Sequence, residues 1–296
     1  MQITASMVKE LREKTGAGMM DCKTALSENS GDFQNSIDWL RKKGIAKADK
    51  KSSRIAAEGL VTAISNGTKG VVLEVNAETD FVAKNEIFSA FVKDLATRIL
   101  ETGTTDVDAI NAMEWQDGKT VAETLKDMIA KIGENMNIRR ATILEVSNGM
   151  VKEYIHMGGK IGVLVAIESA SSDLEEIAKG VAMHVAASNP AALDRDSLDT
   201  TAIERERTIF EEQARASGKP ENIVEKIVEG RVNKFYEESC LTEQAFVMDT
   251  DRKVAEAVTA VAGDAKITGF VRLGLGDGIE KAEDDFAAEV AAAVAS

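Results

Sequence analysis

The stretch Gly70-Val71-Val72-Leu73-Glu74-Val75 decides the fold, because a similar stretch, Gly162-Val163-Leu164-Val165-Ala166-Ile167, follows later in the chain. Both are short apolar runs that begin at a glycine, which is typical of buried β-strands. A related strand pattern precedes each run, starting at Gly59-Leu60-Val61 and at Gly149-Met150-Val151. The chain is therefore predicted to contain two copies of one β-hairpin.

Each predicted hairpin leads into a helix and then into a further strand. Turn residues separate the paired strands at Asn66-Gly67 in the first copy and at Met157-Gly158-Gly159 in the second. Apolar residues at helical spacing follow: Phe88, Phe91 and Leu95 in the first copy, and Leu174, Ile177 and Val181 in the second. A third strand is predicted at residues 140–146 and 267–275. The expected fold is α+β, with a core of two related subdomains that have antiparallel sheets.

The two copies differ in length between the hairpin and the helix. Eighteen positions separate Gly70 from Phe88, but twelve separate Gly162 from Leu174. The surplus falls on Thr79-Asp80-Phe81-Val82-Ala83-Lys84-Asn85, where Phe81 precedes the apolar face of the helix that opens at Asn85. Phe81 either packs locally against its own subdomain or is exposed for contact with a partner. Because the second copy folds without these residues, we favour the exposed side chain that contacts a partner.

Composition narrows the class of protein. The 296 residues carry a formal charge of −14, which argues against nucleic acid as a direct partner. The chain has no apolar run of eighteen residues, which argues against membrane insertion, and its first residues lack the pattern of a signal peptide. Cys22 and Cys240 stand far apart, so neither a disulfide framework nor a zinc site is indicated. A cytoplasmic protein is expected.

Motifs for catalysis are missing from the sequence. It contains no phosphate-binding loop, so no bound nucleotide is expected, and Gly274-Leu275-Gly276-Asp277-Gly278 is interpreted as a turn. His184 lies on an apolar helix face and is interpreted as a core residue, whereas His156, beside the second turn, is the more exposed candidate. With no catalytic residues, metal ligands or cofactor expected, the chain is predicted to be a binding protein rather than an enzyme.

Residues outside the two copies form smaller units. Residues 1–43 are predicted to form three short helices with a thin core, and Met19 and Met20 are candidates for its open surface, although at least one of them is expected in the core. The segment from Lys42 to Arg54 is rich in positive charge and is interpreted as a solvated tether.

The second copy carries a long insertion before its last strand. Residues 199–216 and 220–237 are predicted to form an antiparallel coiled-coil hairpin. Its two apolar seams are Ile203, Phe210 and Ala214 on one arm, and Ile223, Ile227 and Phe235 on the other. A C-terminal helix with Phe286, Val290 and Val294 on one face ends the chain; the sequence does not decide whether it docks on its own body or on a partner. The predicted division is 1–43, the three-helix domain; 44–58, a basic linker; 59–148, the first core subdomain; 149–198 with 238–278, the second; 199–237, the hairpin; and 279–296, the C-terminal helical module.

Several motifs resemble those of one protein family. Residues 11–23, Leu-Arg-Glu-Lys-Thr-Gly-Ala-Gly-Met-Met-Asp-Cys-Lys, and residues 79–84, Thr-Asp-Phe-Val-Ala-Lys, closely resemble bacterial elongation factor Ts. Further similar segments are Lys131-Ile132-Gly133-Glu134-Asn135, His184-Val185-Ala186-Ala187-Ser188 and Gly269-Phe270-Val271-Arg272. The resemblance spans nearly the whole chain. It implies that the N-terminal bundle is similar to a ubiquitin-associated domain.

The resemblance also implies a function, that of a guanine-nucleotide exchange factor for elongation factor Tu. In the family, the segment matching Thr79, Asp80, Phe81 and Val82 enters the GTP-binding domain of the partner and disturbs its magnesium site. Residues matching Ile132, Gly133 and His156 belong to the core contact surface, and the region around Leu11, Met19 and Met20 touches the same domain. The alternative is an adaptor, in which the N-terminal bundle binds a partner and the core is a passive scaffold.

Overall fold

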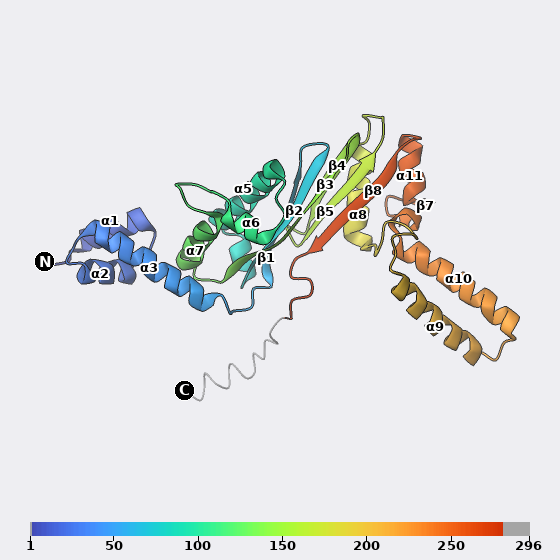
Figure 1. Ribbon diagram of the computed structural model, residues 1–296, viewed down its shortest axis with the longest axis horizontal. Helices are drawn as coiled ribbons and strands as arrows, with labels where there is room; N and C mark the ends of the chain where they lie inside the picture. Colours follow the sequence, from blue (N-terminus) through green and yellow to red (C-terminus); the bar gives the residue numbers. More distant parts are fainter. Residues whose placement is uncertain (1, 281–296) are drawn as a thin grey trace.

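The computed structural model describes residues 2–280. Figure 1 shows an elongated molecule with a helical bundle at one end, a pair of helices at the other, and two sheets between them. The predicted C-terminal helix with Phe286, Val290 and Val294 lies outside the described residues. Of the helices within residues 2–280, none combines the length and the apolar character that a membrane span requires.

The N-terminal bundle consists of α1 (Ala5–Thr15), α2 (Met19–Glu28) and α3 (Phe33–Lys51). The Thr4 hydroxyl accepts the Met7 N–H at the start of α1, and Gly16, at φ +68°, ends it in the left-handed conformation. Leu11, Cys22 and Leu26 are fully buried where the helices meet. The prediction of three helices in this region agrees with the structure.

The interpretation of residues 42–54 as a tether is wrong over most of its length, because α3 continues to Lys51. This part of α3 packs on α7 (Val121–Ile132) so closely that a Cβ at Gly44 would lie 3.1 Å from the Ala130 Cβ. Lys126 pairs with Asp49 at 2.9 Å. The packing partner is distant in the sequence, so the local pattern of charges did not reveal the helix.

The first core subdomain has the strand order β1-β2-β3, with all neighbours antiparallel. The strands are β1 (Glu58–Ser65), β2 (Lys69–Ala77) and β3 (Met136–Glu145), so the third begins earlier than residue 140. The helices are α4 (Asp80–Ala83), α5 (Glu86–Thr102), α6 (Val107–Ala112) and α7. One face of the sheet buries Phe88, Leu95 and Ile99 of α5 in a shared apolar core.

The second core subdomain repeats this plan with the order β4-β5-β8. Its main elements are β4 (Gly149–His156), β5 (Ile161–Glu168), α8 (Glu175–Ser188), α11 (Val254–Val261) and β8 (Lys266–Gly274). A short 3-10 turn (Leu241–Glu243) and the small strands β6 (Ala245–Phe246) and β7 (Asp249–Lys253) precede α11. Leu174, Ile177 and Val181 are buried on the sheet, as predicted. The prediction of an α+β fold with antiparallel sheets is therefore confirmed.

The two sheets pack face to face, each with its helices on the outer face. A third apolar cluster, including Val61, Val72 and Leu164, fills the space between them. A Cβ at Gly70 would lie 2.8 Å from Val151 Cγ1, and one at Gly162 would lie 2.5 Å from Val61 Cγ1. The glycine that opens each repeated strand is therefore needed where the sheets approach most closely.

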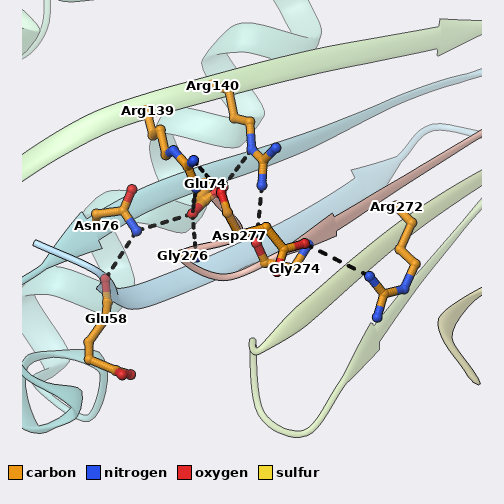
Figure 2. Close-up of polar contacts among 9 residues, drawn as sticks. All are labelled: Glu58, Glu74, Asn76, Arg139, Arg140, Arg272, Gly274, Gly276 and Asp277. Atoms are coloured by element: carbon orange, nitrogen blue, oxygen red, sulfur yellow. Dashed lines mark hydrogen bonds and ion pairs between the residues drawn. The ribbon is translucent and has the colours of Figure 1, made fainter. Parts of the chain in front are cut away.

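Glu74 of β2 is a buried carboxylate at the junction of the two sheets (Figure 2). It accepts hydrogen bonds from Arg139 Nη1 at 2.9 Å, Arg140 Nε at 2.6 Å and the Gly276 N–H at 2.8 Å. Burial alone would raise the pKa of Glu74, but the Gly276 N–H, Arg139, Asn76 and Arg140 outweigh it and hold the pKa below 4.5. The first sheet is thus tied to the turn that follows β8.

A helical hairpin, α9 (Thr200–Ala216) and α10 (Glu221–Ser239), projects from the second subdomain (Figure 1). Ala214 of α9 packs with Val224, Val228 and Val232 of α10. The predicted seam residue Ile223 is exposed instead, because α10 turns its valines toward α9. Two other predicted seam residues, Ile203 and Phe235, pack with Cys240 at the base of the hairpin.

Candidate partner-binding site

Phe81 projects from the end of the first sheet. The segment after β2 forms the single helical turn α4, and the Phe81 side chain is 75 % exposed. Asp80 pairs with Lys84 across this turn at 3.7 Å, and Lys84 Nζ lies 5.7 Å from the centre of the Phe81 ring. The predicted exposure of Phe81 is confirmed, and charged groups flank the ring.

Val82 points the opposite way from its neighbour. It is 3 % exposed and belongs to the apolar core of the first subdomain. The expectation that the inserted residues contribute nothing to packing is therefore wrong for Val82, since one residue of the short turn must face inward when the next faces outward. Val82 anchors α4, so its side chain does not offer a contact surface of its own.

Residues 78–79 and 134–135 hold each other at the foot of α4. Glu134 accepts the Thr79 N–H at 2.9 Å through one carboxylate oxygen and the Thr79 hydroxyl at 2.7 Å through the other. In return, Glu78 accepts the Asn135 N–H at 2.5 Å. The backbone ladder between β2 and β3 ends at the pair Ala77 and Met136. The carboxylates therefore continue the pairing of the two segments beyond the last strand residues.

The segment between α7 and β3, residues 133–135, contacts the end of α3. Asn135 Nδ2 donates to the Arg54 carbonyl at 2.7 Å, and Lys51 Nζ donates to the Gly133 carbonyl. Arg54 also pairs with Glu78 at 3.4 Å. Gly133, at φ +92°, ends α7 and lets the chain reverse into this position. Ile132 is half-buried against the first core.

The remaining predicted contact residues have different environments. Met19 and Met20 are 59 % and 70 % exposed at the start of α2, so neither is in the core. Leu11 has no exposed surface, which corrects its assignment as a contact residue: it supports α1 and α2 from within. His156 is exposed on β4 and lies 3.1 Å from the Tyr154 hydroxyl.

Several of these residues lie at one end of the core. Glu58, which begins β1, is opposite Ala77 at the end of β2 and pairs with Lys160 in the turn after His156. The turn between α1 and α2 approaches α7, since a Cβ at Gly16 would lie 3.1 Å from Lys131 Cε. The structure thus brings Thr79–Val82 together with Ile132 and Gly133, and places the turn after His156 at the same end of the sheets.

Three residues at this site, Glu78, Glu134 and Asn135, were not among the predicted contact residues. The available signal was the motif around Glu134, placed directly before the third strand of its sheet. In an antiparallel sheet, residues before this strand lie opposite residues that follow the middle strand. That register places Glu134 beside Thr79, but it requires the bulge between Glu74 and Val75, which no sequence pattern indicated.

Away from this site, the buried His184 makes its hydrogen bonds within the fold. His184 is buried, its Nε2 lies 2.8 Å from Gln244 Oε1, and its Nδ1 accepts the Val247 N–H. Burial lowers the pKa of His184, although the bond to Gln244 acts in the other direction. Its interpretation as a core residue is confirmed. Over residues 2–280, His, Cys, Asp and Glu side chains form no group of three or more that could hold a metal ion.

Comparison with known proteins identifies relatives over nearly the full length. The family model described as elongation factor TS matches residues 78–277. The elongation factor Ts of Magnetococcus marinus is 57 % identical over 302 residues, covering 99 % of each chain. Those of Brucella anthropi and Paramagnetospirillum magneticum are 57 % and 54 % identical over 304 and 303 residues; the alignments cover 99 % of each chain for the first, and 98 % of this chain and 97 % of the relative for the second.

These matches define a translation elongation factor that takes part in protein biosynthesis. The chain belongs to the elongation factor Ts family.

Proposed function

We propose that this chain is a guanine-nucleotide exchange factor that binds elongation factor Tu carrying GDP and promotes release of the GDP, so that GTP can bind. The observation that carries the proposal is the exposed Phe81 ring on the anchored turn α4. A ring held at a fixed place can enter a partner with little loss of conformational entropy. The chain acts by binding, in the cytoplasm, with no catalytic residue, metal or cofactor of its own.

The mechanism follows from how GDP is held. Phosphate contacts and Mg²⁺ bind the diphosphate, so a factor that displaces those contacts accelerates its release. Burial of a phenylalanine side chain contributes about 1.5–3 kcal/mol, and it favours the open state of the partner if the pocket for the ring exists only there. Asp80 adds a negative charge beside the ring. By linkage, GDP then weakens binding of the factor by the same ratio as the factor weakens binding of GDP.

The remaining candidate residues supply a wide contact surface in this proposal. Thr79 orients the start of α4, and Ile132, Gly133 and His156 contribute from the same end of the core. Met19 and Met20 touch the GTP-binding domain, since exposed flexible thioethers suit contact surfaces. The coiled-coil character of the hairpin α9–α10 and the likeness of the N-terminal bundle to a ubiquitin-associated domain belong to the same proposal.

Stopped-flow release of a fluorescent GDP from elongation factor Tu tests this function. The full chain is expected to accelerate release, and Phe81→Ala to lower the stimulated rate by about 10- to 100-fold, the range that corresponds to the burial of one phenylalanine. Because the ring is exposed, the free energy of unfolding of the variant should differ from that of the unchanged chain by no more than about 0.5 kcal/mol. An unchanged release rate would remove Phe81 from the mechanism, and GDP binding by the isolated chain in calorimetry would contradict the proposal.

A further inference from the structure

Glu134 makes two hydrogen bonds to Thr79, a residue distant from it in the sequence. It follows the end of α7, yet both of its carboxylate oxygens reach Thr79, which precedes α4. Thr79 is the N-cap of α4, but its hydroxyl donates to Glu134 and accepts no N–H of that turn. Charge-assisted bonds of this kind are stronger and more directional than neutral ones.

The turn α4 needs support of this kind because it is only four residues long. So short a helix does not persist on its own, since the first turn fixes several dihedral angles for each hydrogen bond that it gains. Val82 holds one face of α4 in the core, and Asn85, whose N–H donates to the Val82 carbonyl and whose side chain caps α5, fixes where α4 ends; neither contact fixes where the chain enters α4. The two bonds from Thr79 to Glu134 fix the entry of the chain into α4, and thereby the direction of Phe81.

We propose that Glu134 is a positioning residue that holds α4 so that Phe81 points outward before a partner arrives. The expected effect on GDP release rests on the proposed exchange function, whereas the contacts of Glu134 do not depend on it. Asn135 and Glu78 complete the device. They join the foot of α4 to Arg54, just after the end of α3.

The second subdomain contains a similar carboxylate contact but, between the described elements β5 and α8, no turn equivalent to α4. Asp264 lies two residues before β8, as Glu134 lies two residues before β3. Its carboxylate accepts the Ser169 hydroxyl at 2.8 Å and the Ala170 N–H at 2.7 Å, just after β5. Closing the end of a sheet is therefore the shared task of both carboxylates, and orienting an exposed aromatic side chain is added in the first subdomain. Asp264 thus provides a matched control.

The experiment compares Glu134→Ala with Asp264→Ala. Each variant loses two hydrogen bonds at the end of a sheet, so their thermal stabilities should fall by similar amounts. Glu134→Ala alone is expected to lower stimulated GDP release about tenfold, and to raise hydrogen exchange at residues 80–84 of the free chain about tenfold. Glu134→Gln keeps one acceptor oxygen, so its GDP release and hydrogen exchange should lie between those of the unchanged chain and those of Glu134→Ala. This variant provides the test if Glu134→Ala does not fold.

A double-mutant cycle separates positioning from general destabilisation. In the Glu134→Ala background, Phe81→Ala should lower the release rate by less than about threefold, because the ring is already misdirected. Equal effects of the Glu134 and Asp264 variants on GDP release and on hydrogen exchange at residues 80–84, or full additivity of Glu134→Ala with Phe81→Ala, would overturn the inference. If the unchanged chain does not accelerate GDP release, the proposed function fails; hydrogen exchange at residues 80–84 still decides the role of Glu134.

Discussion

The two core subdomains share a plan, but they treat the same strand position in opposite ways. Glu74 in β2 and Ala166 in β5 both directly precede a bulge in the pairing with the third strand. Glu74 is a buried carboxylate with two arginine partners, whereas Ala166 lies in the apolar cluster between the sheets. Likewise, only the first subdomain places the turn α4 between its hairpin and its helix. The repeat therefore supplies a common scaffold, and one copy carries the additional polar and exposed features.

Exchanging the residues at the two bulges should give the largest change in stability. Glu74→Ala leaves Arg139 and Arg140 without their carboxylate and is expected to cost about 3 kcal/mol in the free energy of unfolding. Ala166→Glu, which buries a carboxylate among apolar side chains, should cost at least as much. Urea denaturation followed by circular dichroism measures both. A change below about 1 kcal/mol for either variant would mean that the two sites are not as different as they look.

Adding one methyl group at the repeated glycine should affect both subdomains alike. Gly70→Ala and Gly162→Ala each force a Cβ into a side chain of the opposite sheet, so each should cost about 1–3 kcal/mol. The same denaturation measurement applies, with Gly67→Ala and Gly158→Ala as controls at the two hairpin turns, where the added Cβ would meet open space and the cost comes from the positive φ. A marked difference between Gly70 and Gly162 would show that the two sheets do not approach each other symmetrically.

Lowering the pH should reveal the smallest difference in stability between the two subdomains. The pKa of Glu74 lies below 4.5 in the folded chain, so its contribution to stability is present above pH 4.5 and is lost as the pH falls through the folded pKa. Glu74→Gln removes this contribution and should flatten the loss of stability at low pH. Thermal unfolding between pH 3 and pH 6 tests the comparison. An equally steep loss in the variant would assign the acid sensitivity to other carboxylates.

Local patterns predicted the elements that bury one apolar face. The hairpins, α5 and α8 follow from runs such as Val71–Val75 and from the spacing of Phe88, Phe91 and Leu95, where burial and periodicity agree. The exposure of Phe81 followed from comparing the two copies. The length of α3 was missed because its stability comes from contacts with α7, and Ile223 was placed wrongly because several apolar residues of α10 compete for one seam.

The candidate site was predictable only in part. The predicted exposure of Phe81 agrees with the structure, whereas the expectation that at least one of Met19 and Met20 lies in the core is wrong, since both are exposed. The contacts of Glu134 and Asn135 were not predicted, because they depend on the register of β3 against β2 and on the reversal at Gly133. Residues far apart in the sequence meet there, and hydrogen bonds between them leave no periodic pattern in either segment.

The tie between Glu74 and Gly276 has a consequence for biosynthesis of the chain itself. Residue 276 leaves the ribosome about 200 residues after residue 74, at a synthesis rate of roughly 5–20 residues per second. During that interval, on the order of 10–40 s, the first sheet holds a charged side chain whose backbone partner has not yet been made. The hydrogen bond from the Gly276 N–H to Glu74 can therefore form only when the end of β8 emerges, so the junction of the two sheets is completed late in synthesis.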